Sequence, residues 1–321
     1  MRMKNYSLLF TIFASCAVHA NTNSQWTHFT PNDISASLST GILNGGKARE
    51  LVLYEGDKLS QLDWEVKNAP IVKADLSWQF LPWLSFNAKG WTTLSSNKTT
   101  MNDYDWQDEE NRNLVTDWSH HPDSKLKHAN EFDLNFQGTI LNLPTFKLNG
   151  VVGYQENRFS WNASGGYYNY AYTDEEGNYI PDSAQMLKGE FEEGTSLIGY
   201  QQKFSAPYFG FSGQYIYKDF EVNSLVKYSS WATAKDYDNH YARSFISSNN
   251  AKNSDYYGAM VNIGYNVIPR TKLFTEFNWN EYKLAKGRTV QNDDGELSYN
   301  GATGGISNKH YTVSVGVNHR F

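Results

Sequence analysis

The chain has 321 residues, a formal net charge of -6 at pH 7 and an aromatic content of 16%. Its only cysteine is Cys16, so a disulfide-stapled scaffold is excluded and a large core or a closed sheet must hold the chain together. No stretch after residue 20 has the roughly 18 apolar residues of a membrane-spanning helix, and the combination of polarity with many aromatic residues is typical of a transmembrane β-barrel.

The first 20 residues resemble an export signal. Basic residues in MRMK precede an apolar run, and VHA at residues 18–20 provides a small-residue cleavage site. A weak lipoprotein box, FASC at residues 13–16, is an alternative that would leave Cys16 lipidated, although Phe fits its first position poorly. We therefore predict a signal peptide over residues 1–20 and a single barrel domain over residues 21–321.

Apolar and polar residues alternate with a period of two in many later segments, as in NEFDLNFQGTIL, which predicts strands with one apolar face. The chain also ends on an aromatic residue, Phe321, which is typical of outer-membrane barrels. We predict ten strands, an even number as single-chain bacterial barrels have. The predicted ranges are 32–43, 59–81, 83–95, 128–141, 145–163, 195–217, 220–233, 253–268, 271–287 and 308–321.

The connections between these strands are of two kinds. Four are tight, near residues 81–82, 142–144, 218–219 and 269–270, and five are long and polar, over 44–58, 96–127, 164–194, 234–252 and 288–307. The fold class is therefore an all-β, ten-stranded antiparallel transmembrane β-barrel. Its short turns are expected on the periplasmic side and its long loops outside the cell.

The second predicted strand gives two expectations about the interior. Pro70 cannot donate a ladder hydrogen bond, so a bulge is expected there. The residues predicted to point inward are rich in charge, which argues against the wide water channel of a general porin. They are Asp63, Glu65, Lys67, Lys73, Asp75 and Lys89.

Two acidic clusters lie at the outer ends of predicted strands. Asp236, Asp238 and His240 share one face of an extended chain, and Asp103 and Asp105 do so in the opposite half of the sequence. In a ten-stranded barrel the second and fourth outer loops lie across the rim from each other. The sequence therefore allows the two clusters to face each other over a cleft.

Such a pair of clusters can hydrolyse a bond without a protein nucleophile. Asp238 would fix the tautomer of His240 and leave its other nitrogen to take a proton from water. Asp103 and Asp105, crowded as like charges, would share a proton. Two alternatives remain open from spacing alone: acidic loops that only solvate the surface, and a divalent metal site, although no Cys set or H-x-x-x-H motif supports the latter.

The sequence resembles the omptins, outer-membrane endoproteases of Gram-negative bacteria, over nearly the whole chain after the signal. A plasminogen-activator-like branch of the family is left open. The matching stretches are SQLDW, GWTTL, MNDYDW, HANEFDLN, GYQENRFSW, IGYQQKFSAPYFG, DNHY and GISNKHYTVSVGV. The resemblance implies a ten-stranded barrel in the cell outer membrane whose active site faces the exterior.

The resemblance also implies the catalytic residues, an Asp–Asp couple and an Asp–His dyad. They are Asp103, Asp105, Asp238 and His240. The family usually has Glu where this chain has Asn239, which leaves the dyad intact.

Three further acids match substrate-binding positions of the family. Glu50 and Asp236 match the pocket for a basic residue before the cleaved bond, and Asp117 matches a subsite for a basic residue after it. Residues 101–123 contain seven acids and one base, Arg112, so the barrel mouth is expected to attract cationic peptides.

A separate set of residues matches the lipopolysaccharide site of the family: Tyr154, Glu156, Arg158, Lys203 and Lys252. Lys203 replaces the usual Arg, which keeps the charge and loses bidentate phosphate geometry. Without the resemblance these would be interfacial residues that extend toward water. The expected protein is a monomeric endopeptidase that needs no metal or other cofactor, with lipopolysaccharide as an activating lipid. Its expected partners are cationic peptides or proteins, and no nucleic acid. The alternative is a non-catalytic adhesin or invasin barrel.

Overall fold

The computed structural model describes residues 33–176, 178–180 and 186–321. The predicted signal peptide lies outside the described residues. No helix in the described part of the chain is long and apolar enough to cross a membrane.

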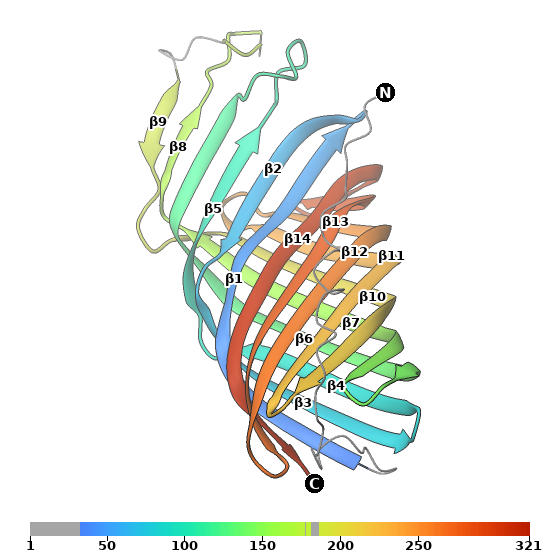
Figure 1. The fold of residues 1–321 in the computed structure, drawn as a ribbon. Helices are drawn as coiled ribbons and strands as arrows, with labels where there is room; N and C mark the ends of the chain where they lie inside the picture. The colour runs from blue at the N-terminus through green and yellow to red at the C-terminus, as the bar shows by residue number, and fades with distance from the viewer. Residues whose placement is uncertain (1–32, 177, 181–185) are drawn as a thin grey trace, which may run out of the picture.

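The described chain is almost entirely strand (Figure 1). A 3-10 turn, η2 (Tyr241–Arg243), follows β11. The strands are β1 (Asp33–Tyr54), β2 (Asp57–Val66), β3 (Ala69–Leu81), β4 (Leu84–Thr93), β5 (Asn97–Asp105), β6 (Asp117–Asn142), β7 (Phe146–Ser164), β8 (Tyr167–Tyr170), β9 (Leu187–Glu190), β10 (Ser196–Tyr217), β11 (Phe220–His240), β12 (Phe245–Ile268), β13 (Thr271–Asp293) and β14 (Glu296–Arg320).

These strands close into an antiparallel barrel. β14 pairs with β1 from Ser35↔Arg320 to Val52↔Gly304, which joins the two ends of the sheet. β2 and β3 both pair with β1, one above the other, and β4 and β5 both pair with β6, so each couple forms one interrupted barrel strand. β8 and β9 form a hairpin that extends β6. The ring therefore has ten strands, as predicted.

The strands extend much further outward than predicted. β14 begins at Glu296 rather than at 308, and β6 begins at Asp117 rather than at 128. The expected loops 44–58 and 288–307 are mostly hairpin arms closed by tight turns, with positive φ at Glu55 and Gly56 and at Asp294 and Gly295. Apolar alternation stops where the outer face leaves the lipid, although backbone hydrogen bonding continues, and this is why the pattern underestimated the strands.

The irregularity in the second barrel strand lies at Lys67–Asn68, not at Pro70. Asn68 has φ of 49°, whereas Pro70 stays in register with Ile42. The break changes which residues point inward: Trp64 and Val66 are buried before it, and Ala69 and Ile71 after it. The prediction of inward-pointing Asp63, Glu65 and Lys67 is therefore wrong, because the even-numbered residues above the break point inward; Asp63 pairs with Arg49 instead.

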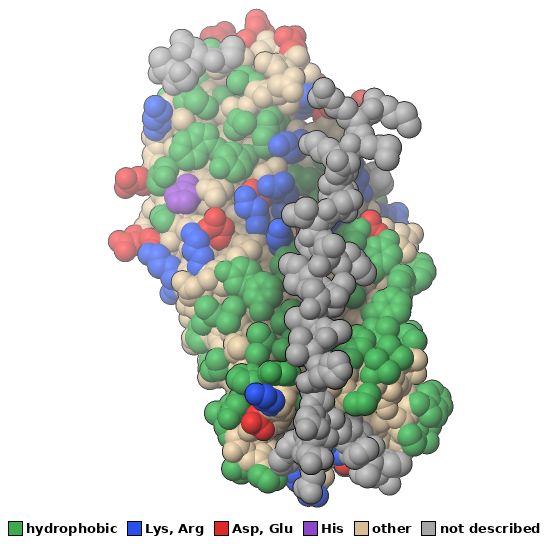
Figure 2. Space-filling view, in the orientation of Figure 1, with side chains coloured by type: hydrophobic (Ala, Val, Ile, Leu, Met, Phe, Trp, Pro, Cys, Tyr) green, Lys and Arg blue, Asp and Glu red, His purple; other side chains and the backbone are tan. Residues whose placement is uncertain are grey.

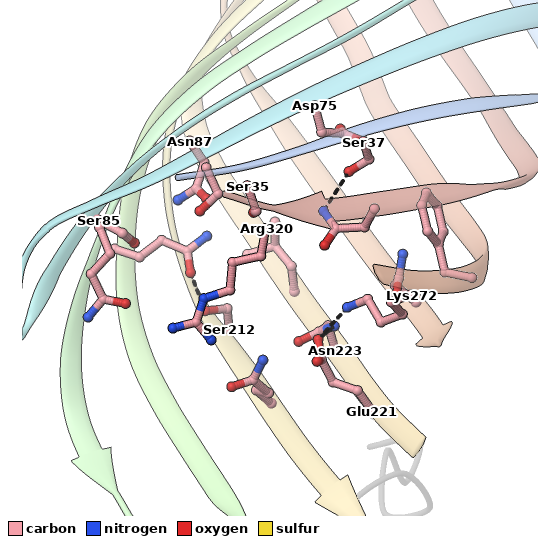
Figure 3. A pocket seen from close by; sticks show the side chains of 18 of the residues that line it. Ser35, Ser37, Asp75, Ser85, Asn87, Ser212, Glu221, Asn223, Lys272 and Arg320 are labelled. Atoms are coloured by element: carbon pink, nitrogen blue, oxygen red, sulfur yellow. Dashed lines mark hydrogen bonds and ion pairs between the residues drawn. The ribbon is translucent and has the colours of Figure 1, made fainter. Parts of the chain in front are cut away.

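The lower half of the barrel is polar inside and apolar outside. In the interior Lys227 forms an ion pair with Asp133 at 2.9 Å, and Lys73 pairs with Glu276. Below these pairs a cavity of about 280 Å³ opens among polar side chains such as Glu221, Lys272 and Arg320 (Figure 3). Figure 2 shows apolar side chains around the lower half and charged ones above. Exposed apolar side chains include Leu38, Leu134, Phe136, Val152, Phe211, Val226, Ile263, Leu273 and Val315.

Candidate active site

The predicted Asp–His dyad is formed at the outer end of β11. The alternation of the strand turns Asp236, Asp238 and His240 into the barrel, where they are 6%, 2% and 8% exposed, while Tyr237 between them is 40% exposed on the outside. His240 donates from Nε2 to Asp238 Oδ2 at 2.6 Å. The hydrogen bond fixes the orientation of the ring, as the spacing predicted.

The aspartate couple lies at the outer end of β5, between β2 and β6. The pKa of Asp103 is raised well above its usual range. The causes, largest first, are desolvation, the negative charge of Asp105 and that of Asp238. The pKa of Asp105 is also raised, chiefly by desolvation and against a hydrogen bond from Ser60. The influence of Asp238 on Asp103 means that the two clusters, far apart in sequence, lie near each other across the barrel mouth.

Several acidic oxygens in this cleft have no hydrogen-bond partner among the described residues. Asp103 Oδ1, Asp238 Oδ1 and Glu50 Oε2 are buried and accept no hydrogen bond from the described part of the chain. Buried polar atoms are normally satisfied, so such a group indicates a place for water or a ligand. The cleft therefore presents free carboxylate oxygens on three different strands.

Glu50 and Asp236 meet in one buried pocket, as the resemblance implied. Asn249 on β12 links them: its Nδ2 donates to Glu50 Oε1 at 3.1 Å and to Asp236 Oδ2 at 3.1 Å. Tyr200 donates to Asp236 at 3.2 Å. Burial raises the pKa of Asp236 to about 7, and burial together with the charge of Asp236 raises that of Glu50 well above its usual range. The pocket offers two carboxyl groups to a cation, and burial favours their protonated forms.

Asp117 lies beside the couple. It is opposite Asp105 in the β5–β6 ladder and accepts a hydrogen bond from Thr116 Oγ1 at 2.8 Å. Partial burial raises its pKa. Tyr170 on β8 is opposite Asp117 in the β6–β8 ladder. Burial and the charges of Asp103 and Asp105 raise the pKa of Tyr170 to about 12. This edge of the cleft is therefore acidic, with a neutral phenol beside it.

Three residues near the acids were missed from sequence. Asn249 and Tyr170 come from neighbouring strands and have no motif of their own. Arg243 lies three residues after His240, and its Nη2 donates to His240 Nδ1 at 2.8 Å. Its position three residues after the dyad was the sequence signal that could have indicated Arg243.

Four of the five predicted lipid-binding residues form one cluster on the outer face of β7 and β10. Glu156 accepts hydrogen bonds from Tyr154 at 3.2 Å and from Lys203 at 3.0 Å, and it pairs with Arg158. Lys252 is exposed on β12, and within the described residues no ion pair joins it to the other four. The cluster presents two exposed cations held by one carboxylate.

The described residues contain no group of three or more His, Cys, Asp or Glu side chains arranged to hold a metal ion.

Comparisons with known proteins agree with one another. A model described as the Omptin family matches residues 30–321. The chain is 42% identical to the plasminogen activator of Yersinia pestis, over 99% of this chain and 100% of that protein, and 39% identical to protease 7 of Escherichia coli (strain K12), over 100% of both. The crystal structure of the outer membrane protease OmpT from Escherichia coli superposes with a TM-score of 0.84 at 39% identity, covering 92% of this chain and 98% of that one.

Proposed function

The chain belongs to the omptin family and is an outer-membrane protease, and from that premise we propose that it cleaves extracellular peptides and proteins next to Arg or Lys with water as the nucleophile. The observation that carries the proposal is the meeting of the Asp103 and Asp238 clusters, from β5 and β11, in one acidic cleft.

His240 is the proposed general base. Its Nε2 is occupied by Asp238, so Nδ1 is the nitrogen that takes a proton from the attacking water. The carboxylate of Asp238 then stabilises the imidazolium that forms. The raised pKa of Asp103 supports a proton shared with Asp105, which lets one carboxyl orient the water and the other donate to the developing oxyanion.

Glu50 and Asp236 are proposed to bind the basic side chain before the cleaved bond. A guanidinium or ammonium entering this pocket gains two carboxylates, with Asn249 holding both in place. Asp117 is proposed to favour a basic residue after the cut, because it lies next to the couple.

Lipopolysaccharide is proposed as the activating lipid, and the protein is proposed to act as a monomer. Arg158 and Lys203 are exposed on the outer barrel surface and can pair with lipid phosphates. Lys252 is kept in the proposed set as a separate cation on β12.

The test measures cleavage of peptides that differ only by Arg or Gln before the bond, using Asp103→Ala and His240→Ala variants in outer-membrane preparations. The proposal expects both variants to lose cleavage of the Arg peptide while remaining folded β-barrels by circular dichroism. Unchanged cleavage in either variant would overturn the assigned roles.

A further inference from the structure

The proposed base is covered in the substrate-free protein. A guanidinium has only N–H donors, so its 2.8 Å contact requires an unprotonated Nδ1 on His240. Nδ1 is the same nitrogen that must accept a proton from water. Water and Arg243 therefore compete for one position.

The surroundings show where the guanidinium lies. It stacks near Phe245, 5.9 Å from the ring centroid, and Phe245 itself packs edge-on against His240. Its positive charge lowers the pKa of both Asp103 and Asp105, against the larger effect of desolvation. Among the described residues no carboxylate lies within 4.0 Å of it. Arg243, an exposed residue, is thus held at the edge of the acidic cleft by its hydrogen bond to His240 and by the surrounding negative charge, not by an ion pair of its own.

The segment that carries Arg243 can release it. Tyr241–Arg243 form a single exposed 3-10 turn without a side-chain cap, and Ser244 after it has φ of 52°. The long side chain can leave the cleft by changing its rotamers, with no movement of the barrel. A single charge-assisted hydrogen bond to a neutral ring is also weak enough to be exchanged for another contact.

On the basis of the proposed function, we propose that the Arg243 guanidinium covers His240 Nδ1 in the substrate-free enzyme, and that a cationic substrate displaces it. Like charges repel, so a basic side chain in the Glu50–Asp236 pocket disfavours the guanidinium nearby. A neutral substrate lacks this effect and leaves His240 covered. Arg243 would therefore raise KM for basic substrates and lower kcat for neutral ones.

The experiment compares Arg243→Ala and Arg243→Gln with the wild type, using peptides with Arg or citrulline before the bond. Arg288→Ala is the matched control, because Arg288 is an exposed arginine at the outer end of β13 that stacks on Tyr299 and lies next to inward-pointing Thr289. Loss of one competing charged hydrogen bond should lower KM for the Arg peptide by about five- to thirty-fold with kcat maintained. For the citrulline peptide, which leaves His240 covered in the wild type, the variants should instead raise kcat with little change in KM. The control should keep both parameters.

Guanidinium chloride then identifies the site that Arg243 leaves. The added ion should inhibit Arg243→Ala at lower concentration than the wild type, because it refills the place beside His240. An unchanged KM for the Arg peptide in both Arg243 variants would overturn the proposal. A fall in kcat that guanidinium restores would also overturn it, because that result would make Arg243 an electrophile in the wild type. A wild type that cleaves no basic peptide would instead reject the proposed function.

Discussion

Replacing Asp236 with Asn tests the substrate pocket. The change keeps the shape of the side chain and an oxygen for the Asn249 N–H, and it removes one of the two charges that would face a substrate cation. It also replaces the oxygen that accepts from Asn249 Nδ2 and Tyr200 with an N–H donor. A hydrogen bond to a charged group contributes about 1.5–3 kcal/mol, so kcat/KM for an Arg peptide should fall by about ten- to 150-fold. A citrulline peptide has no charge to lose and should be cleaved at nearly the wild-type rate.

The pH dependence gives the same prediction a second readout. Burial raises the pKa of Asp236 to about 7, so at pH 6 only about one tenth of this carboxyl is ionised and kcat/KM for the Arg peptide should be about ten-fold below its plateau. This limb should disappear in Asp236→Asn. A carboxyl with a raised pKa in the folded state costs stability as pH rises through that pKa, so the variant should also unfold at higher temperature than the wild type at pH 8.

The assay is steady-state cleavage of the two peptides between pH 5.5 and 8.5, with the barrel in lipopolysaccharide-containing micelles. Glu50→Gln provides the companion variant from the other side of the pocket. An Asp236→Asn variant that keeps both the wild-type preference for Arg over citrulline and the wild-type pH profile would refute the assigned role of Asp236.

Three further predictions concern other parts of the molecule. His121 accepts a hydrogen bond from Ser119 and donates one to Gly165 O, and burial lowers its pKa. The stability that neutral His121 supports is therefore present above about pH 6.5 and is lost below it. Hydrogen exchange in the β8–β9 hairpin should speed up at pH 5, and His121→Gln should remove that pH dependence. Arg158→Ala should raise the lipopolysaccharide concentration for half-activation several-fold without changing activity at saturation, and an unchanged titration would reject the lipid site. Inhibitors of serine and cysteine proteases and metal chelators should leave activity intact, whereas loss with a chelator and recovery with one specific ion would favour the metal alternative.

The part of the fold that contacts lipid could be predicted from sequence, and the part above it only in outline. Segments such as 128–141 alternate because one face meets the membrane and the other the interior. Above the membrane both faces are polar, so the outer half of β14 gives no alternation although its backbone ladder continues. The break at Asn68 was also missed, because an Asn in the left-handed region carries a weaker signal than the proline beside it.

The candidate site shows the same division. Asp236, Asp238 and His240 follow from a period of two on one strand, and the structure places all three in the cleft. The link through Asn249 depends on which strands become neighbours and how their registers align, as in Asp238↔Ser247, and a local pattern does not contain that information. The contact of Arg243 depends on a turn and a rotamer, which the sequence does not specify.

The central claim is that Asp103 and His240, from opposite halves of the chain, act on one water molecule. A double-mutant cycle in kcat/KM with Asp103→Asn, His240→Ala and the double variant measures this directly. If Asp103 and His240 act as a unit, the double variant should lose about as much activity as the less active of the two single variants. Losses that multiply, so that the double variant falls by the product of the two single effects, would contradict the account.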